Sequence, residues 1–111
     1  MKRGEIYYAN LDPTIGSEIK KKRPVLIISS NANNRASSTV TVIPITSNIT
    51  KVYPFEVLLM KKDSGLIKDS KAQCHQIRTI SKLRIAEQRA GVVNKEILRR
   101  IQMALELHLD F

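Results

Sequence analysis

Short apolar segments, separated by turn and loop residues, fill the first 93 positions of this 111-residue chain, and their spacing is what most limits its fold. Each segment alternates apolar with polar residues or is rich in β-branched residues, which is typical of β-strands. No helix of 10–15 residues alternates with them, which argues against a parallel sheet of β–α–β units. We therefore predict a mainly β fold, a small and strongly bent antiparallel sheet or barrel. The expected strands are residues 5–9, 25–29, 39–46, 55–60, 71–80 and 89–93.

Two local features refine this prediction. Residues 31–38 are polar and show no period, so we expect a loop there. Pro44 lies within the third strand and cannot donate a hydrogen bond to a neighbouring strand. The end of that strand is therefore expected at a sheet edge or a bulge.

One helix is expected, over residues 95–109. Asn94 is a favourable N-cap, and Glu96 places a negative charge in the first turn, where the helix dipole favours it. Six apolar residues recur at helical spacing and are predicted to face the core: Ile97, Leu98, Ile101, Ala104, Leu105 and Leu109. Met103 and Leu107 lie off the centre of this stripe, where they are available to another subunit.

Length and composition indicate one domain spanning residues 1–111, large enough to fold around its own core without a disulfide or a metal. The single cysteine, Cys74, excludes a disulfide within the chain and favours a reducing compartment. No apolar run approaches the roughly 20 residues of a membrane-spanning helix. Glu5 and Asp12 interrupt the apolar residues near the N-terminus, unlike a signal peptide. We expect a cytoplasmic protein without a membrane partner.

The net charge of +9 narrows the choice of partner. Lysines and arginines are spread along the chain and form no separate basic tail. A strongly basic protein attracts nucleic acid, an anionic membrane or an acidic protein. A membrane-surface helix needs its basic residues on one face with bulky apolar residues opposite. The predicted helix carries four basic residues, counting His108, against two acidic ones, which does not favour a membrane. Nucleic acid or an acidic protein is therefore the favoured partner.

The segment from Gly16 to Ser30 carries the strongest local signal for function. Its polar part ends in Lys20–Lys22, and Arg23-Pro24 then leads into an apolar run. Because proline favours extended backbone in the residue before it, Arg23 is expected at the start of a buried strand. A guanidinium held there offers a planar fork to phosphate oxygens, and the lysines add less directional attraction. The alternative is a solvated charged loop before an ordinary strand.

A second polar set lies in the predicted strand 71–80. Strand alternation places Gln76 and Arg78 on one face and His75 on the other. An amide and a guanidinium on one exposed face suit an RNA groove, although an edge strand with a solvated face is the alternative. Histidines and cysteines lack metal-ligand spacing, glycines form no phosphate loop, and no Ser–His–Asp triad can be assigned. We expect no metal and no cofactor.

Five sequence blocks, taken together, resemble the MazF/PemK family of toxin endoribonucleases. They are RGEIY at 3–7, LDPTIGSE at 11–18, KRPVLII at 22–28, IPITS at 43–47 and QIRTI at 76–80. Each block alone is weak, but five in this order and at matching separations are specific and cover nearly the whole chain. Residues 46–59, followed by CHQIRT, are most similar to the chromosomal MazF branch.

The resemblance implies a small SH3-like β-barrel of the MazF, PemK and CcdB type with a C-terminal helix, and a homodimer. It implies ribosome-independent and metal-independent cleavage of single-stranded RNA, mainly mRNA, at short sequences. It also implies inhibition by an acidic, MazE-like antitoxin whose tail occupies the RNA groove. A non-catalytic nucleic-acid-binding module and a gyrase-poisoning toxin of the same fold remain alternatives.

Carried over by position, Arg23 matches the catalytic arginine of the family and Thr46 its catalytic threonine. Ser17 occupies the loop where plasmid-borne PemK-type toxins have a histidine. Those toxins have an arginine and an aspartate where this chain has Gln73 and His75. Their acid–base scheme is therefore not expected to apply unchanged.

Cleavage through the substrate 2′-hydroxyl requires removal of one proton, donation of another and stabilisation of negative charge on the phosphate. Arg23 suits the third task, but a guanidinium is a poor base. Glu18 and His75 have the side-chain types that transfer protons near neutrality, and they are the candidates for this task. The predicted RNA-binding residues are Ser17, Lys20, Lys21, Lys22, Ser47, Asn48, Lys71, Gln76 and Arg78.

Overall fold

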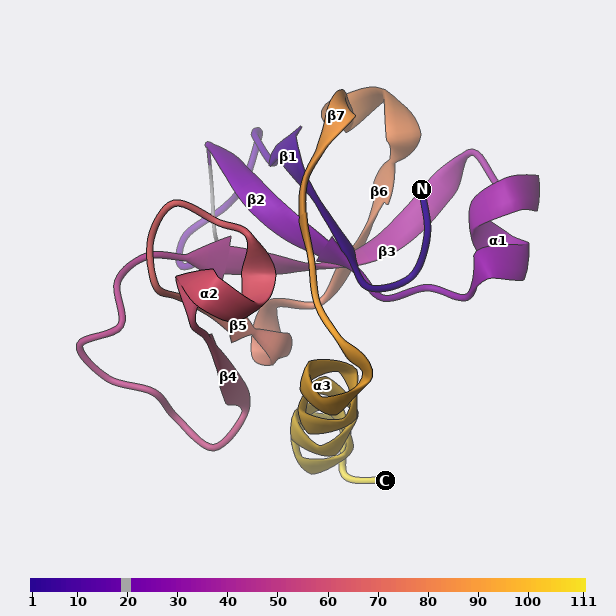
Figure 1. Ribbon diagram of the computed structural model, residues 1–111. Helices are drawn as coiled ribbons and strands as arrows, with labels where there is room; N and C mark the ends of the chain where they lie inside the picture. Colours follow the sequence, from indigo (N-terminus) through magenta and orange to yellow (C-terminus); the bar gives the residue numbers. More distant parts are fainter. Residues whose placement is uncertain (19–20) are drawn as a thin grey trace.

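Seven strands form one curled antiparallel sheet in the computed structural model, which describes residues 1–18 and 21–111 (Figure 1). The strands are β1 (Glu5–Asn10), β2 (Lys22–Ile27), β3 (Thr39–Thr46), β4 (Glu56–Leu59), β5 (Ser70–Gln73), β6 (Arg78–Ser81) and β7 (Ile85–Val92). Their order is β4-β5-β3-β2-β1-β7, and β6 pairs with β3 beside this path. No pairing joins β4 to β7 within the described residues, so the sheet is an open barrel. The predicted class, mainly β with a C-terminal helix, is confirmed.

Three α-helices and two 3₁₀ turns complete the fold. They are α1 (Asn31–Ala36), α2 (Lys61–Ser64), α3 (Lys95–Leu109), η1 (Cys74–Gln76) and η2 (Lys82–Arg84). The loop expected over residues 31–38 is wrong in part, because residues 31–36 form α1. Ser30 caps this helix by accepting a hydrogen bond from the Asn33 amide at 3.2 Å. In the described part of the chain, no helix is both long and apolar enough to cross a membrane.

Helix α3 has the predicted bounds and the predicted cap. The Asn94 side chain accepts a hydrogen bond from the Ile97 amide at 2.9 Å. Ile97, Ile101 and Ala104 are buried against the sheet. Leu109, predicted to face the core, is exposed, because it lies in the last turn of α3 at the end far from the sheet (Figure 1). Most of the stripe is therefore core.

The sheet buries a different cluster on each face. The first cluster, covered by α3, includes Ile6, Leu26, Ile43, Ile45, Val57, Leu59, Ile97 and Ile101. The second, enclosed by the curl of the sheet, includes Tyr7, Ala9, Leu11, Val25, Ile27, Val40, Val42 and Ile80. Alternate residues of the central strands supply the two clusters, as strand geometry requires. This division determines which polar side chains meet at the ends of β2 and β3.

The single strand predicted over residues 71–80 is two strands separated by η1. β5 pairs with the end of β3 at Ile45 and Thr46, whereas β6 pairs with its first half, from Thr39 to Val42. Pro44 lies where β3 changes partner, so its missing N–H falls at this break. The end of β3 was predicted at a sheet edge or a bulge. The edge is wrong, because β3 is a central strand and its change of partner beside Pro44 accommodates the proline.

Strand β7 begins at Ile85 and not at residue 89 as predicted. It pairs only with β1, through a register with bulges, and most of its middle residues are exposed. An edge strand of this kind does not need a regular apolar pattern. The sequence from residue 85 to 88 therefore gives little indication of a strand.

Gly91 of β7 lies directly against the carbonyl oxygen of Ser64 at the end of α2, where a Cβ atom would overlap backbone. We expect Gly91→Ala to lower the free energy of unfolding by about 1–3 kcal/mol, because neither backbone segment can move without disturbing its packing. Urea denaturation measures this change, with Ala86→Ser on the exposed part of β7 as the control. An unchanged urea midpoint for Gly91→Ala would contradict the close approach.

Candidate active site

Arg23 lies near the start of β2 and Thr46 is the last residue of β3, so these two neighbouring antiparallel strands bring them to the same end of the sheet. The β2–β3 ladder ends at the pair Val25–Pro44. Continued by two residues, the same register sets Arg23 against Thr46. Directly opposed residues in an antiparallel pair have Cβ atoms about 5 Å apart on the same face. A guanidinium and a hydroxyl from separate strands therefore project together from the end of the second-cluster face.

Two predicted RNA-binding residues donate hydrogen bonds to the β1–β2 loop and hold its Leu11 and Ser17 beside this face. The Arg78 guanidinium donates to the Leu11 carbonyl oxygen at 3.3 Å. The Gln76 amide donates to the Ser17 carbonyl oxygen at 3.4 Å. Arg78 pairs with Val42 and lies two residues before the buried Ile80, so it is on the face of the second cluster. Strand alternation places Arg23 on this same face. The structure thus groups Arg23, Arg78 and the loop.

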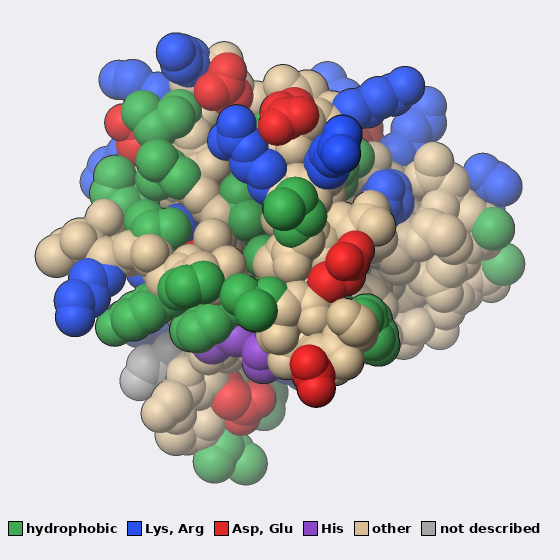
Figure 2. Space-filling model, turned by 90° about the horizontal axis from the view of Figure 1, so that it is seen from below, with side chains coloured by type: hydrophobic (Ala, Val, Ile, Leu, Met, Phe, Trp, Pro, Cys, Tyr) green, Lys and Arg blue, Asp and Glu red, His purple; other side chains and the backbone are tan. Residues whose placement is uncertain are grey.

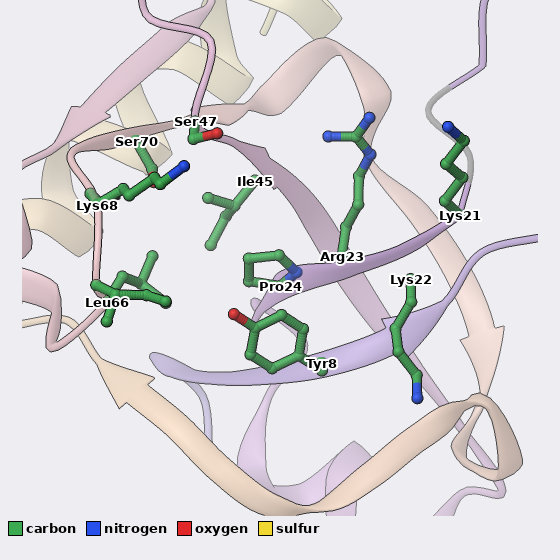
Figure 3. A pocket seen from close by; sticks show the side chains of 11 residues that line it. Tyr8, Lys21, Lys22, Arg23, Pro24, Ile45, Ser47, Leu66, Lys68 and Ser70 are labelled. Carbon is green, nitrogen blue, oxygen red and sulfur yellow. Dashed lines mark hydrogen bonds between the residues drawn. The ribbon is translucent and has the colours of Figure 1, made fainter.

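A pocket of about 400 Å³ opens next to Arg23 (Figure 3). It is lined by Tyr8, Lys21, Lys22, Arg23, Pro24, Ile45, Ser47, Leu66, Ile67, Lys68 and Ser70. These residues come from β1, β2, β3, β5 and the adjoining loops. The pocket therefore depends on tertiary packing of segments about 60 residues apart.

The described lining of this pocket contains four cations and no acidic residue. In Figure 3 Arg23 and Lys68 stand on opposite sides of the pocket, while the ammonium of Lys22 points away from it. Cations gathered around a concavity concentrate positive potential there and attract anions. Phosphate groups are the anions that a planar guanidinium binds through two oxygens.

The sequence predicted four of the lining residues, Lys21, Lys22, Arg23 and Ser47, and missed Lys68 and Tyr8 as site residues. Lys68 reaches the pocket from the loop between α2 and β5, and nothing local in the sequence indicates this. Tyr8 gave a usable signal, because it is the exposed aromatic between the buried residues Tyr7 and Ala9. Lys20, predicted to bind RNA, lies outside the described residues.

Lys71 occupies a different environment from the exposed groove that was expected. Its side chain is only 9% exposed, and its ammonium lies 3.0 Å from the Glu56 carboxylate, which is 2% exposed. It also donates a hydrogen bond to the Lys51 carbonyl oxygen. The face of β5 opposite to the pocket is packed, which is why a strand-end lysine became a buried ion-pair partner.

His75 lies in an aromatic cluster near α3 and not among the residues that line the pocket. Its ring centroid is 4.4 Å from that of Phe55 and 6.4 Å from that of His108. Burial lowers the pKa of His75, helped by His108 and Lys71 and opposed by Glu56. Seen from below, both histidines lie among hydrophobic side chains (Figure 2). The alternation argument that placed His75 opposite Gln76 does not hold, because η1 replaces the strand there.

Two other predicted groups take part in turns of the backbone. The Glu18 carboxylate accepts a hydrogen bond from the Ile15 amide at 2.7 Å in the β1–β2 loop. The Thr46 hydroxyl accepts one from the Asn48 amide at 3.2 Å, and Asn48 in turn accepts one from the Thr50 amide. These bonds fix both turns that border the strand ends carrying Arg23 and Thr46.

The remaining reactive side chains do not form a second centre. Burial raises the pKa of the Cys74 thiol to about 12, so the thiol stays protonated at neutral pH. Outside residues 19 and 20, no three His, Cys, Asp or Glu side chains gather closely enough to hold a metal ion.

The fold and site define a small basic protein with a cationic pocket that includes Arg23, at the end of the sheet where β3 ends in Thr46. The family model of PemK-like, MazF-like toxins of type II toxin–antitoxin systems matches residues 2–109. The chain is 45% identical to endoribonuclease MazF9 of Mycobacterium tuberculosis over 99% of its own length and 97% of that protein. It is 37% identical to endoribonuclease EndoA of Bacillus subtilis, over 98% and 94% of the two chains. The chain belongs to the PemK-like, MazF-like toxin family.

Solved structures show the same fold. The MazF crystal structure from Deinococcus radiodurans matches with a TM-score of 0.86 at 23% identity, covering 100% of this chain and 97% of that one. A mycobacterial endoribonuclease, solved in complex with its cognate antitoxin, matches with a TM-score of 0.81 at 23% identity, covering 100% and 96%. The open barrel with its C-terminal helix is thus shared with MazF toxins.

Proposed function

We propose that this chain is the toxin of a type II toxin–antitoxin pair and acts as a sequence-specific endoribonuclease on single-stranded RNA in the cytoplasm. The observation that carries the proposal is a pocket lined by four cations, Arg23 among them, at the end of the sheet where β3 ends in Thr46. Two relatives that match nearly the whole chain are named endoribonucleases. The expected substrate is mRNA, cleaved without the ribosome and without a metal ion.

The chemistry follows from what these side chains can do. The substrate 2′-hydroxyl oxygen attacks the adjacent phosphorus, the bond to the 5′-oxygen of the next nucleotide breaks, and that oxygen takes up a proton. The products are a 2′,3′-cyclic phosphate and a 5′-hydroxyl. Arg23 stabilises the negative charge that grows on the phosphate oxygens, and the Thr46 hydroxyl orients the 2′-hydroxyl by a hydrogen bond.

For proton removal from the 2′-hydroxyl we place Glu18 ahead of His75. Glu18 follows Ser17, whose carbonyl oxygen Gln76 holds beside the face of Arg23. His75 instead packs against Phe55 and His108, a residue of α3. A general base must reach the proton that it removes, so position favours the carboxylate. The exposed side chains of Ser17, Ser47 and Asn48 are positioned to contact RNA that enters along these loops.

The cationic pocket and the loops beside it also suit the binding of an acidic antitoxin. An acidic, MazE-like peptide that is disordered when free would place carboxylates where RNA places phosphates, and it would order on binding.

An apolar groove of about 480 Å³ between β4 and α3 lies apart from the cationic pocket. Its exposed Leu58, Met103 and Leu107 are the surface that we assign to a homodimer contact.

Purified toxin incubated with protein-free RNA in excess EDTA tests this function. We expect cleavage at a short recurring sequence, products with 5′-hydroxyl ends, and loss of cleavage when the cognate antitoxin is added. Binding of RNA without any cleavage at high enzyme concentration would contradict the proposal and support a non-catalytic nucleic-acid-binding protein. Cleavage that EDTA abolishes would contradict the metal-independent mechanism.

A further inference from the structure

The pocket beside Arg23 has an apolar floor as well as a cationic rim. Tyr8 pairs with Pro24 across β1 and β2. The β2–β3 register, continued one residue beyond the pair Val25–Pro44, sets Pro24 against Ile45, and both residues line the pocket. The three side chains therefore form one row across three strands on the face away from Arg23 and Thr46. Leu66 closes the side of this row (Figure 3). A phosphate site alone has no use for such a floor.

Tyr8 is the accessible part of that floor. It is 37% exposed, whereas Ile45 is fully buried and Leu66 is 8% exposed. In Figure 3 the Tyr8 ring lies at the mouth of the pocket beside the Pro24 ring. An aromatic ring that is open to solvent next to cations is how proteins bind unpaired bases, because each base has a face that can stack.

Polar groups stand on one side of this floor. In Figure 3 the ammonium of Lys68 and the hydroxyl of Ser47 lie close together at the edge of the pocket, across from the Arg23 guanidinium. No ion pair in the described part of the chain includes Lys68. Cations on two sides of an apolar floor match a nucleotide within an RNA strand, which carries one base and has a phosphate on its 5′ side and another on its 3′ side.

We propose that this pocket binds one nucleotide next to the scissile phosphate, with its base stacked on Tyr8 and its outer phosphate held by Lys68. The proposal rests on the proposed function and deepens it, because it assigns one position of the recognised sequence to this pocket. A volume of about 400 Å³ limits it to a single nucleotide. Tyr8 and Lys68 are then residues that bind substrate and select sequence.

The test measures coupling between the Tyr8 ring and one base. The probe is a short RNA that carries the cleavage sequence of the wild-type toxin, made uncleavable by a 2′-deoxy nucleotide at the scissile position. A matched set lacks one base at each flanking position. We expect one missing base to weaken wild-type binding by about five- to 100-fold. Tyr8→Ala should weaken binding of the intact RNA similarly and lose nothing more when that base is missing.

Two variants separate stacking from damage to the fold. Tyr8→Phe keeps the ring and should keep the coupling. Tyr53→Ala removes an exposed tyrosine outside the pocket, and its effect should simply add to that of the missing base. Lys68→Gln should reduce the slope of log affinity against log salt by about 0.7, the value for one phosphate contact on a single strand.

Several outcomes would overturn the proposal. If Tyr8→Ala and every missing base have additive effects, no base stacks on Tyr8. If the same variants weaken only an acidic antitoxin peptide, the pocket serves the antitoxin and not RNA. A wild-type toxin that cleaves RNA in either case leaves the proposed function standing. A wild-type toxin that neither binds nor cleaves RNA refutes the function together with this inference.

Discussion

Replacing Arg23 with alanine should lower the single-turnover rate of RNA cleavage by about 100- to 1,000-fold, the usual cost of removing one preorganised donor from a developing anion. Arg23→Lys should recover little of this loss, because an ammonium cannot bind two phosphate oxygens in one plane. Thermal stability should change little, since Arg23 is half-buried at the start of β2 and belongs to neither core cluster.

Lys22→Ala is the matched control for this experiment. Lys22 precedes Arg23 in β2, but its ammonium points away from the pocket (Figure 3). Its loss should weaken RNA binding slightly and leave the rate of the bound complex near that of the wild type. Wild-type rates for Arg23→Lys, or equal losses for Arg23→Ala and Lys22→Ala, would remove Arg23 from the chemistry.

The second large effect concerns stability. Lys71→Met should lower the free energy of unfolding by about 3–5 kcal/mol, because it leaves the Glu56 carboxylate buried without its partner. A double variant with Glu56→Gln should recover much of this loss, since neither charge is then buried. Urea denaturation at pH 7 measures all three proteins. A loss below 1 kcal/mol for Lys71→Met would contradict the buried ion pair.

The pH dependence of stability provides an independent check on Glu56. Burial alone would raise the pKa of its carboxyl, but hydrogen bonds from the Tyr53 amide and Lys71 outweigh burial and lower it. A carboxyl with a lowered pKa in the folded state stabilises the fold above its unfolded pKa of about 4.3. That contribution disappears as the pH falls through the folded pKa. The difference in stability between wild type and Glu56→Gln should therefore shrink below about pH 4, and parallel curves would contradict this.

The sequence predicted the elements that have a regular period. The apolar repeat and the cap at Asn94 determine α3 with its observed bounds. Local signals failed where tertiary packing decides the structure. η1 interrupts the strand predicted over residues 71–80 because β3 exchanges β5 for β6, which no short-range pattern indicates. β7 is an edge strand without an apolar pattern, so half of it was missed.

In the candidate site, too, local sequence patterns indicated some residues, whereas tertiary packing decides the roles of others. Arg23 and the lysines before it could be found because Pro24 and the apolar run after it fix where the strand begins. The contribution of Lys68 depends on how the loop after α2 folds against β1 to β3. The burial of Lys71 depends on its packing against Glu56 of the paired strand β4. The position of a lysine in the sequence does not say whether its charge is free for RNA or paired inside the fold.

The most direct test of the account is cleavage of a short RNA that carries a single 2′-deoxy nucleotide at the scissile position, compared with the all-ribose RNA, in EDTA. Wild-type toxin should cut only the all-ribose RNA and leave a 2′,3′-cyclic phosphate and a 5′-hydroxyl, and Arg23→Ala should cut that RNA about 100- to 1,000-fold more slowly. Cleavage of the 2′-deoxy RNA at the same bond, or products with 5′-phosphate ends, would contradict attack by the 2′-hydroxyl at the Arg23–Thr46 site.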